Sequence, residues 1–341
     1  MKKIFFFLVI ALAVGACQNK ANNEVEKKGS SGKTLEMMIV ADKNLYQGEV
    51  KEFLDSMFAS PQIGLPQPES KFDLVNIPKS SYENSEMFQN HRNIILLDIN
   101  PDNPNKVYMQ IDQYAAPQVI FDFAMTDIAA LKENLLKYES VILREIYSAE
   151  HRRVIKAFKG MQNYNLTQKV YDKFAFNLMF SNEFQWAKED VDFAWIRKEA
   201  KDFGLGILVD VFPYENQNVF TEQKILDRMD TIMKRHVPAS KDSSYMGLER
   251  RKNESGEYLA PIVLKTVDFP NSEYCVETRG CWRAFGDFMG GPFVSYTLLS
   301  PDKKNVIMLT GYVYCPRNKP WTKRDLLMQA ESICWSINWD K

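Results

Sequence analysis

The spacing of hydrophobic and polar positions changes repeatedly along the chain between a strand-like and a helix-like period. Apolar residues at helical spacing predict a helix over 49–58 and a long helix that Thr126 caps and whose apolar stripe ends at Phe158. The pattern at Ser148 predicts a break in that helix. Short apolar runs predict strands in the first half, over residues 35–41, 72–77, 93–99, 107–111 and 118–123.

The second half of the chain shows the same alternation after Gly160. One helix is predicted after a cap at Thr221, and another over 321–335. Strands are predicted over 174–180, 192–200, 206–212, 261–268, 273–279, 293–299 and 305–315. Because strands outnumber helices and the connections are short, the pattern predicts an α+β fold with mostly antiparallel sheets and helices packed on one face.

One stretch in each half of the chain has the same pattern. Ile95 to Pro101 matches Ile207 to Pro213, each being a run of branched apolar residues with one Asp and a closing Pro. This similarity raises the hypothesis of two related β-rich units. We therefore expect an N-terminal α+β unit over 34–160 and a C-terminal α+β unit over 161–341.

The first residues have the features of a secretion signal. Lys2 and Lys3 precede an unbroken apolar run from residue 4 to 14, which is shorter than the roughly 20 residues that a membrane-spanning helix needs. The run ends in small residues followed by Cys17, a pattern that resembles the lipobox of bacterial lipoproteins. We expect residues 1–16 to be a signal peptide and Cys17 to carry lipid that attaches the protein to a membrane.

The residues after the cysteine predict a flexible tether over 17–33, because almost all of them are polar or small. We expect this tether to keep the folded body near the membrane but off it. Gln18 and Asn19 follow Cys17 where an Asp would favour the inner membrane, so the resemblance to lipoprotein sorting signals implies the outer membrane. The periplasmic face and the cell surface both remain open.

Charge and cysteine content narrow the possible partners. The chain has a formal net charge of −1, and loss of Lys2 and Lys3 with the signal makes it −3, so nucleic acid is not expected as a partner. The four later cysteines include no CxxC pair, which excludes a redox motif of that type. Buried free thiols are favoured for them, with a disulfide from Cys315 to Cys334 or to Cys281 as the alternative; the four are Cys275, Cys281, Cys315 and Cys334.

No motif in the sequence predicts a metal, a cofactor or a catalytic centre. The three histidines, His91, His151 and His236, do not have the spacing of metal ligands. Phosphate loops, dinucleotide fingerprints and nucleophile elbows are not found. The basic clusters at 151–153 and 234–236 are interpreted as solvated helix faces, with contact to lipid headgroups or anionic glycans as the alternative.

Several short sequence motifs in the second half resemble those of one family. The most specific is Glu277-Thr278-Arg279-Gly280-Cys281-Trp282 followed by Met289-Gly290-Gly291-Pro292-Phe293, and Phe193 to Glu199 is another. Together they resemble domain-of-unknown-function family 4837, whose members are envelope lipoproteins of Gram-negative bacteria. The resemblance is expected to extend from about Thr34 onward, and Cys281 stands where the family pattern has Leu. It implies an envelope location and a fold, but no activity and no catalytic residues.

The same motifs supply the candidate ligand-binding residues. An Arg beside a Trp can hold a carboxylate or a sugar ring, and glycines allow a close approach of the backbone. A second candidate is a pair on one strand face, Arg197 and Glu199. A turn between strands and a rim ion pair are the simpler interpretations of these residues. The first candidate group is Arg279, Trp282, Asp287, Gly290 and Gly291.

These observations favour an envelope lipoprotein that binds a ligand or partner, such as an envelope protein or a glycan, through its C-terminal half without catalysis. The alternative is a hydrolase that acts on a cell-wall or glycan substrate. That alternative requires a deep pocket with two carboxyl groups about 5–10 Å apart.

Overall fold

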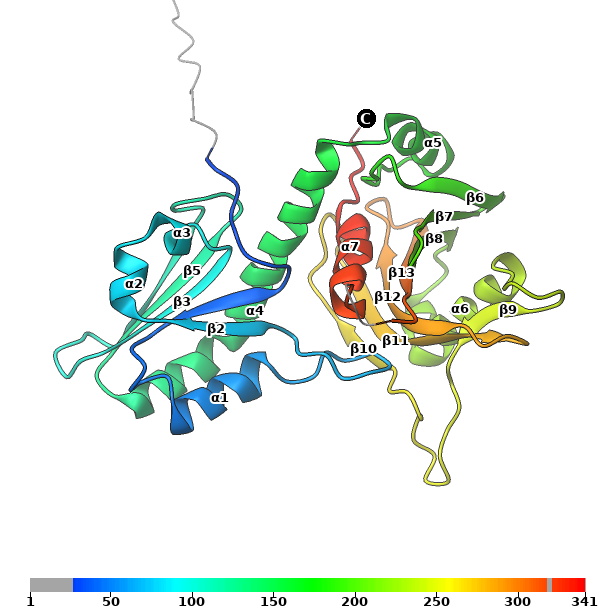
Figure 1. The fold of residues 1–341 in the computed structure, drawn as a ribbon. Coiled ribbons are helices and arrows are strands. Elements are labelled where there is room, and N and C mark those ends of the chain that lie inside the picture. The colour runs from blue at the N-terminus through cyan, green and yellow to red at the C-terminus, as the bar shows by residue number, and fades with distance from the viewer. Residues whose placement is uncertain (1–26, 318–320, 341) are drawn as a thin grey trace, which may run out of the picture.

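The computed structural model of the protein describes residues 27–317 and 321–340. Two β-sheets lie side by side, and the long helix α4 (Ile128–Lys159) runs between them (Figure 1). Cys17 and the predicted signal peptide lie outside the described residues. Within the described part of the chain, every helix is too short or too polar to span a bilayer.

The N-terminal sheet has the strand order β2-β1-β3-β5-β4, and only β4 runs antiparallel to its neighbour. Alternate residues of β1 point to opposite faces, so that Met37 packs under α1 (Gly48–Phe58) and α4, whereas Met38 packs under Tyr82 of α2 (Lys79–Glu83). A short helix α3 (Glu86–Gln89) follows α2. The strands are β1 (Glu36–Val40), β2 (Asp73–Ile77), β3 (Asn93–Ile99), β4 (Lys106–Ile111) and β5 (Val119–Met125).

The C-terminal sheet is antiparallel throughout, in the order β10-β11-β12-β13-β8-β7-β6, and β9 pairs with part of β11. Helix α7 (Lys323–Trp335) covers one face and α6 (Glu222–His236) covers the other. Two further helical segments are α5 (Tyr164–Phe174) and η1 (Gln217–Phe220). The strands are β6 (Gln185–Asp190), β7 (Phe193–Glu199), β8 (Gly204–Pro213), β9 (Tyr245–Leu248), β10 (Val263–Thr266), β11 (Cys275–Phe285), β12 (Gly290–Leu299) and β13 (Asn305–Tyr314).

The α+β class and the predominance of antiparallel pairing are confirmed. Helices nevertheless cover both faces of each sheet. Successive residues of a strand point to opposite faces, and in both sheets apolar side chains occur on both faces. The two similar stretches both form interior strands, β3 and β8, yet β3 has parallel neighbours and β8 has antiparallel ones. This difference in strand direction argues against a duplicated unit.

Helix α4 is continuous through Ser148, so the predicted break is wrong. Its first half packs on the N-terminal core through Leu131, whereas Phe158 near its end belongs to the C-terminal core. The irregular stripe reflects this change of packing partner. The cap is Asp127 instead of Thr126, because the Asp127 carboxylate accepts a hydrogen bond from Ala130 N at 2.8 Å. Similarly, Thr221 precedes α6, but its hydroxyl donates to Asn218 O.

The predicted strand over 174–180 is also wrong. Helix α5 ends at Phe174, and the chain then turns through Ala175 with a φ of 59°. Phe176, Leu178 and Phe180 occupy alternate positions as in a strand, but they pack into the core from a segment without regular secondary structure. Its backbone forms no ladder: an isolated bridge pairs Asn177 with Asn338, and Phe180 O accepts a hydrogen bond from Asn163 N at 2.9 Å. Because every second side chain of this segment is buried, its sequence shows the same alternation as a strand.

The last part of the predicted tether contacts the folded body. Ala116 N donates to Lys28 O at 2.9 Å, and Ser31 N donates to Asn90 O at 2.9 Å. Arg153 Nε also donates to Ser30 Oγ at 3.0 Å. Residues 28–31, which precede Thr34, are therefore fixed to the folded body.

Candidate functional site

Strand β11 separates the candidate residues that the sequence placed together. Arg279 and Trp282 are three positions apart, so their side chains leave the strand on opposite faces. Trp282 packs in the core under α6, whereas Arg279 points toward Glu331 on α7. Two cavities result, one on each face of the C-terminal sheet.

The first cavity, which we call the aromatic groove, has a volume of about 360 Å³. Its aromatic wall consists of Trp195, Trp282, Tyr312 and Tyr314, and Arg197 and Glu199 lie at its polar end. The structure thus brings Trp282 together with the second predicted pair. Apolar residues from the segment after α6, from β9 and from the β11–β12 connection complete the lining, including Val237, Pro238, Met246 and Met289.

Hydrogen bonds fix the aromatic rings of the groove. Trp195 Nε1 donates to Tyr312 Oη at 2.9 Å, and Trp282 Nε1 donates to Val313 O at 3.1 Å. The rings of Trp282 and Tyr312 meet edge to face with centroids 5.6 Å apart. Burial raises the pKa of Tyr312, so its hydroxyl stays protonated. The groove wall is therefore pre-formed, and the polar ring atoms of Trp195, Trp282 and Tyr312 are already paired.

Arg197 and Glu199 form the ion pair that the strand alternation predicted. Arg197 Nη1 lies 3.5 Å from Glu199 Oε1, and the guanidinium lies 4.8 Å from the centroid of the Trp195 ring. The two side chains remain 43 % and 57 % exposed, so both can still bond to a ligand. Such an exposed pair contributes little to stability.

Of the remaining predicted residues, Asp287 lies in the β11–β12 connection, and Gly290 and Gly291 begin β12. Asp287 accepts a hydrogen bond from Ser240, a groove residue, and lies 3.6 Å from Lys241 Nζ. That hydrogen bond, followed by the bond from Phe288 N, lowers the pKa of Asp287. Positive φ occurs at Gly286 (85°), which the sequence analysis did not single out.

Gly290 and Gly291 are required for close approach and not for turn geometry. A Cβ on Gly291 would lie 2.0 Å from Val313 O and 3.2 Å from Trp282 Nε1. A Cβ on Gly290 would lie 3.0 Å from Trp282 O. The two glycines therefore allow the backbone contacts that seat Trp282 in the groove wall.

On the opposite face, Arg279 occupies a buried charged cluster. Arg279 Nε donates to Glu277 Oε1 at 2.9 Å, and Nη2 donates to Glu331 Oε1 at 2.6 Å. Tyr296 Oη lies 3.1 Å from Glu277 Oε2 and 2.9 Å from Glu331 Oε1. Burial alone would raise the pKa of Glu277, but attraction to Arg279 and Lys265 outweighs it and lowers the pKa to about 2. The same guanidinium thus contacts both carboxylates, and it holds Glu277 as an anion.

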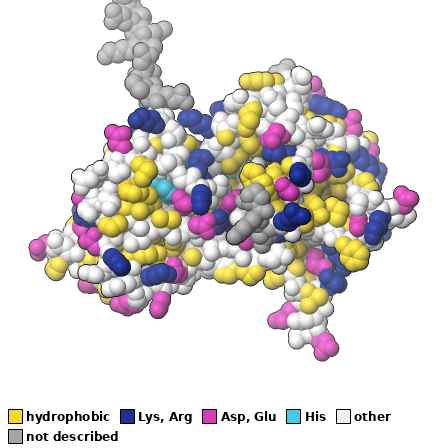
Figure 2. Space-filling view, in the orientation of Figure 1, with side chains coloured by type: hydrophobic (Ala, Val, Ile, Leu, Met, Phe, Trp, Pro, Cys, Tyr) yellow, Lys and Arg dark blue, Asp and Glu magenta, His cyan; other side chains and the backbone are white. Residues whose placement is uncertain are grey.

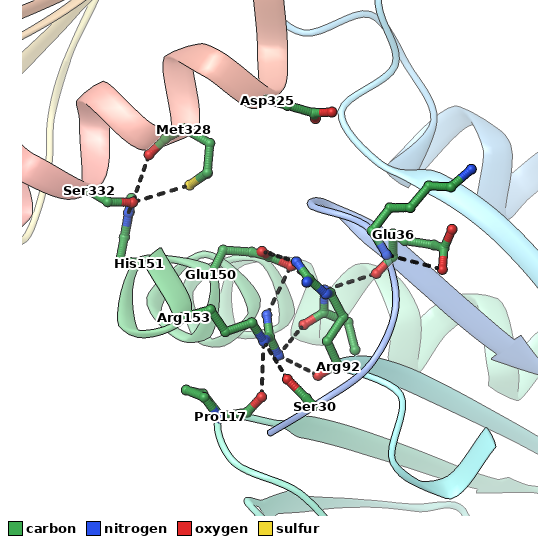
Figure 3. A network of polar contacts seen from close by, with 12 residues as sticks. Ser30, Glu36, Arg92, Pro117, Glu150, His151, Arg153, Asp325, Met328 and Ser332 are labelled. Carbon is green, nitrogen blue, oxygen red and sulfur yellow. Dashed lines mark hydrogen bonds and ion pairs between the residues drawn. The ribbon is translucent and has the colours of Figure 1, made fainter. Parts of the chain in front are cut away.

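The charged cluster lines a cavity of about 620 Å³ between the two sheets, with His151 of α4 on its other side. Ser332 Oγ donates to Met328 O at 2.7 Å, so His151 Nδ1 must donate to Ser332 Oγ at 3.0 Å (Figure 3). His151 Nε2 lies 3.8 Å from Glu331 Oε1. Burial lowers the pKa of His151, which keeps the ring neutral at pH 7.

The predicted solvated face at 151–153 is wrong for two of its three residues. His151 is buried against α7, and Arg153 points inward, where Nη2 donates to Arg92 O at 2.6 Å and Nη1 pairs with Glu150 at 2.9 Å (Figure 3). In the second basic cluster, His236 is buried against the Phe193 ring, with centroids 4.1 Å apart. Both helices use these residues for packing between elements.

The cysteines of the described residues are free thiols, as the sequence analysis favoured, and all four are buried. Burial raises the pKa of Cys281 to about 11, which makes its thiol unreactive at pH 7. Across residues 27–317 and 321–340, no group of three or more His, Cys, Asp and Glu side chains is arranged to hold a metal ion.

Two protein families match different parts of the chain. The family described as "Domain of unknown function (DUF4837)" matches residues 163–336. The chain belongs to this DUF4837 family. Residues 30–159 match a different family, "Domain of unknown function (DUF8532)", so the expected extension of DUF4837 to Thr34 is wrong.

Residues 1–18 of this DUF4837 protein match the prokaryotic membrane lipoprotein lipid attachment site, which includes Cys17. The protein is therefore a lipoprotein anchored to a membrane. No match to the chain is found among curated proteins.

Proposed function

We propose that this lipoprotein resides on the outer membrane and binds a ligand in the aromatic groove without catalysing a reaction. The observation that carries the proposal is the pre-formed aromatic wall next to the exposed pair of Arg197 and Glu199. Ligand sites are usually concave and largely apolar, with a few placed polar groups, and volumes of about 300–1,000 Å³ are typical. The groove has these properties.

The chemistry of the groove favours a saccharide, such as an envelope glycan or the glycan of an envelope partner. Sugar rings present C–H faces that pack on aromatic side chains, and their hydroxyls bond to charged groups. Tyr314, which is half-buried, and the edge of Trp282, which is 5 % exposed, supply apolar surface, and Arg197 and Glu199 supply a donor and an acceptor.

The carboxylates near the groove support binding instead of hydrolysis. Glu199 pairs with Arg197, and Asp287 has a lowered pKa. A glycosidase needs one carboxylic acid with a raised pKa as proton donor. In the charged cluster on the other face, Glu277 has a pKa of about 2 and holds no proton to donate at neutral pH. These charge arrangements do not favour the hydrolase alternative.

Titration of the full-length lipoprotein with soluble peptidoglycan fragments tests the proposal, with tryptophan fluorescence as the signal. Loss of one charged hydrogen bond costs about 1.5–3 kcal/mol, so Arg197→Ala should weaken binding roughly tenfold or more. Lys303→Ala is the matched control, because Lys303 also forms an exposed ion pair, with Glu273 at 2.8 Å, away from the groove. Equal affinities of the two variants, or no binding by the parent protein, would refute a saccharide site here. Separation of inner and outer membranes by density tests the location.

A further inference from the structure

The surface where the N-terminal segment joins the folded body carries exposed apolar side chains. Residues 27–31 pass between α3 and the β4–β5 loop, because Ser31 Oγ donates to Met87 O at 3.4 Å and Lys27 Nζ donates to Asp112 O. Met87 is 64 % exposed on one side of this segment, and Ile111 and Tyr114 are 41 % and 42 % exposed on the other. These three residues lie at the same end of the N-terminal sheet, where Gln118 of the β4–β5 loop donates to Gln89 O of α3, and we call the surface there the exit face.

The exit face extends along the edge of the N-terminal sheet. Met109 lies two residues before Ile111 on β4, so both side chains point to the same side of the sheet, the side that α1 and α4 cover, and Met109 is 47 % exposed. Single exposed apolar residues are normal, whereas a cluster of them marks a contact surface. Aromatic and apolar side chains of this kind are suited to the headgroup region of a bilayer.

The lipid attachment site identifies what covers this surface. About ten residues separate Cys17 from Lys27, and a chain of that length spans at most about 36 Å when fully extended. Because residues 28–31 are fixed to the body, they add nothing to that reach. The exit face is thus the part of the described body that the lipid anchor holds closest to the bilayer.

Charges around the exit face are compatible with a phospholipid surface. Lys28, which is paired with Glu86 at 3.7 Å, and Arg152, which is paired with Asp112 at 3.0 Å, border it together with Lys27. Three basic groups thus stand against two acidic ones. In Figure 2 dark blue side chains gather beside the emerging N-terminal segment.

We propose that the exit face rests on the lipid bilayer, so that the anchor and this patch together fix the orientation of the protein on its membrane. The aromatic groove belongs to the other unit, beyond α4. This orientation keeps the groove available to ligands from the aqueous side. The proposal does not depend on what the groove binds.

Nitroxide labels on the full-length acylated protein test the proposal, using vesicles of phosphatidylethanolamine and phosphatidylglycerol. The native thiols of the described body are buried, so a cysteine introduced by Tyr114→Cys is the accessible one. We expect its label to lose contact with a water-soluble paramagnetic quencher on vesicles and to gain contact with a lipid-soluble one. A label at Leu259→Cys is the control, because Leu259 is 59 % exposed in the β9–β10 loop, at the opposite end of the molecule (Figure 1).

Replacement of the patch gives a second readout. With the label at Gln113→Cys, the combined changes Met87→Ser, Ile111→Ser and Tyr114→Ser should restore contact with the water-soluble quencher while the protein still floats with the vesicles. Identical quenching at positions 114 and 259 would overturn the proposal. Shielding of the label at position 114 from the water-soluble quencher without vesicles would also overturn it, because a second copy of the chain would then cover the exit face.

Discussion

Arg279 and Trp282 lie on the same strand but serve opposite faces of the C-terminal sheet. Arg279 is held by Glu277 and Glu331 beneath α7, whereas Trp282 donates to Val313 O in the wall of the aromatic groove. The strand therefore couples two different environments. A substitution at one position is expected to act on stability, and a substitution near the other is expected to act on binding.

Replacing Arg279 with Met should destabilise the fold by about 3–5 kcal/mol, because it leaves two buried carboxylates without their shared cation. Chemical denaturation measures this difference. Arg197→Ala is the control, since its exposed pair with Glu199 is worth at most about 1 kcal/mol. Similar losses in the two variants would show that the charged cluster does not behave as a buried ion network.

The charged cluster also predicts a pH dependence. Arg279 lowers the pKa of Glu277 from 4.5 to about 2 despite burial. A carboxyl with a lowered pKa in the folded state contributes stability above its unfolded pKa and loses it as pH falls through its folded pKa. The free energy of unfolding of the parent protein should thus approach that of Glu277→Gln between pH 4.5 and about 2. A difference between the two that stays constant over this range would contradict the assignment.

Cys17→Ala should release the protein from the membrane fraction, because without acylation only weak surface contacts remain. Sedimentation of envelopes followed by immunodetection measures this. The control is Cys281→Ala, which removes a buried, unreactive thiol and should leave the protein membrane-bound. Retention of the Cys17→Ala variant on washed membranes would show that another anchor exists.

The fold was predictable wherever one face of an element stays buried against one partner. Helix α1 and strands β3, β8 and β13 follow their apolar patterns closely. Prediction failed where tertiary contacts change along an element. Helix α4 exchanges one core for another between Ala149 and Phe158, and the residues after Phe174 alternate without pairing as a strand.

The candidate site was predictable in part for the same reason. The alternation of side chains along β7 predicted that Arg197 and Glu199 lie on a common face. In the structure, both residues line the aromatic groove together with Trp282. Alternation also implied that Arg279 and Trp282 diverge, once β11 was known to continue through Gly280 without a turn. Neither Tyr312 nor Glu331 could be found from the sequence, because strand and helix packing brings them from distant positions.

Gly291→Ala should change the position of Trp282 in the wall of the aromatic groove. Its Cβ would lie 2.0 Å from Val313 O, the acceptor of the Trp282 Nε1 hydrogen bond, so the β12–β13 pairing must shift. Overpacking of this kind costs about 1–3 kcal/mol, and backbone atoms cannot relax as a flexible side chain does. Gly256→Ala is the matched control for the loss of a glycine, since nothing lies within 4 Å of its added Cβ, although its φ of 84° adds local strain. Denaturation should show the larger loss for Gly291→Ala, and only this variant should change the emission of the groove tryptophans. Unchanged emission would mean that Gly291 does not seat Trp282.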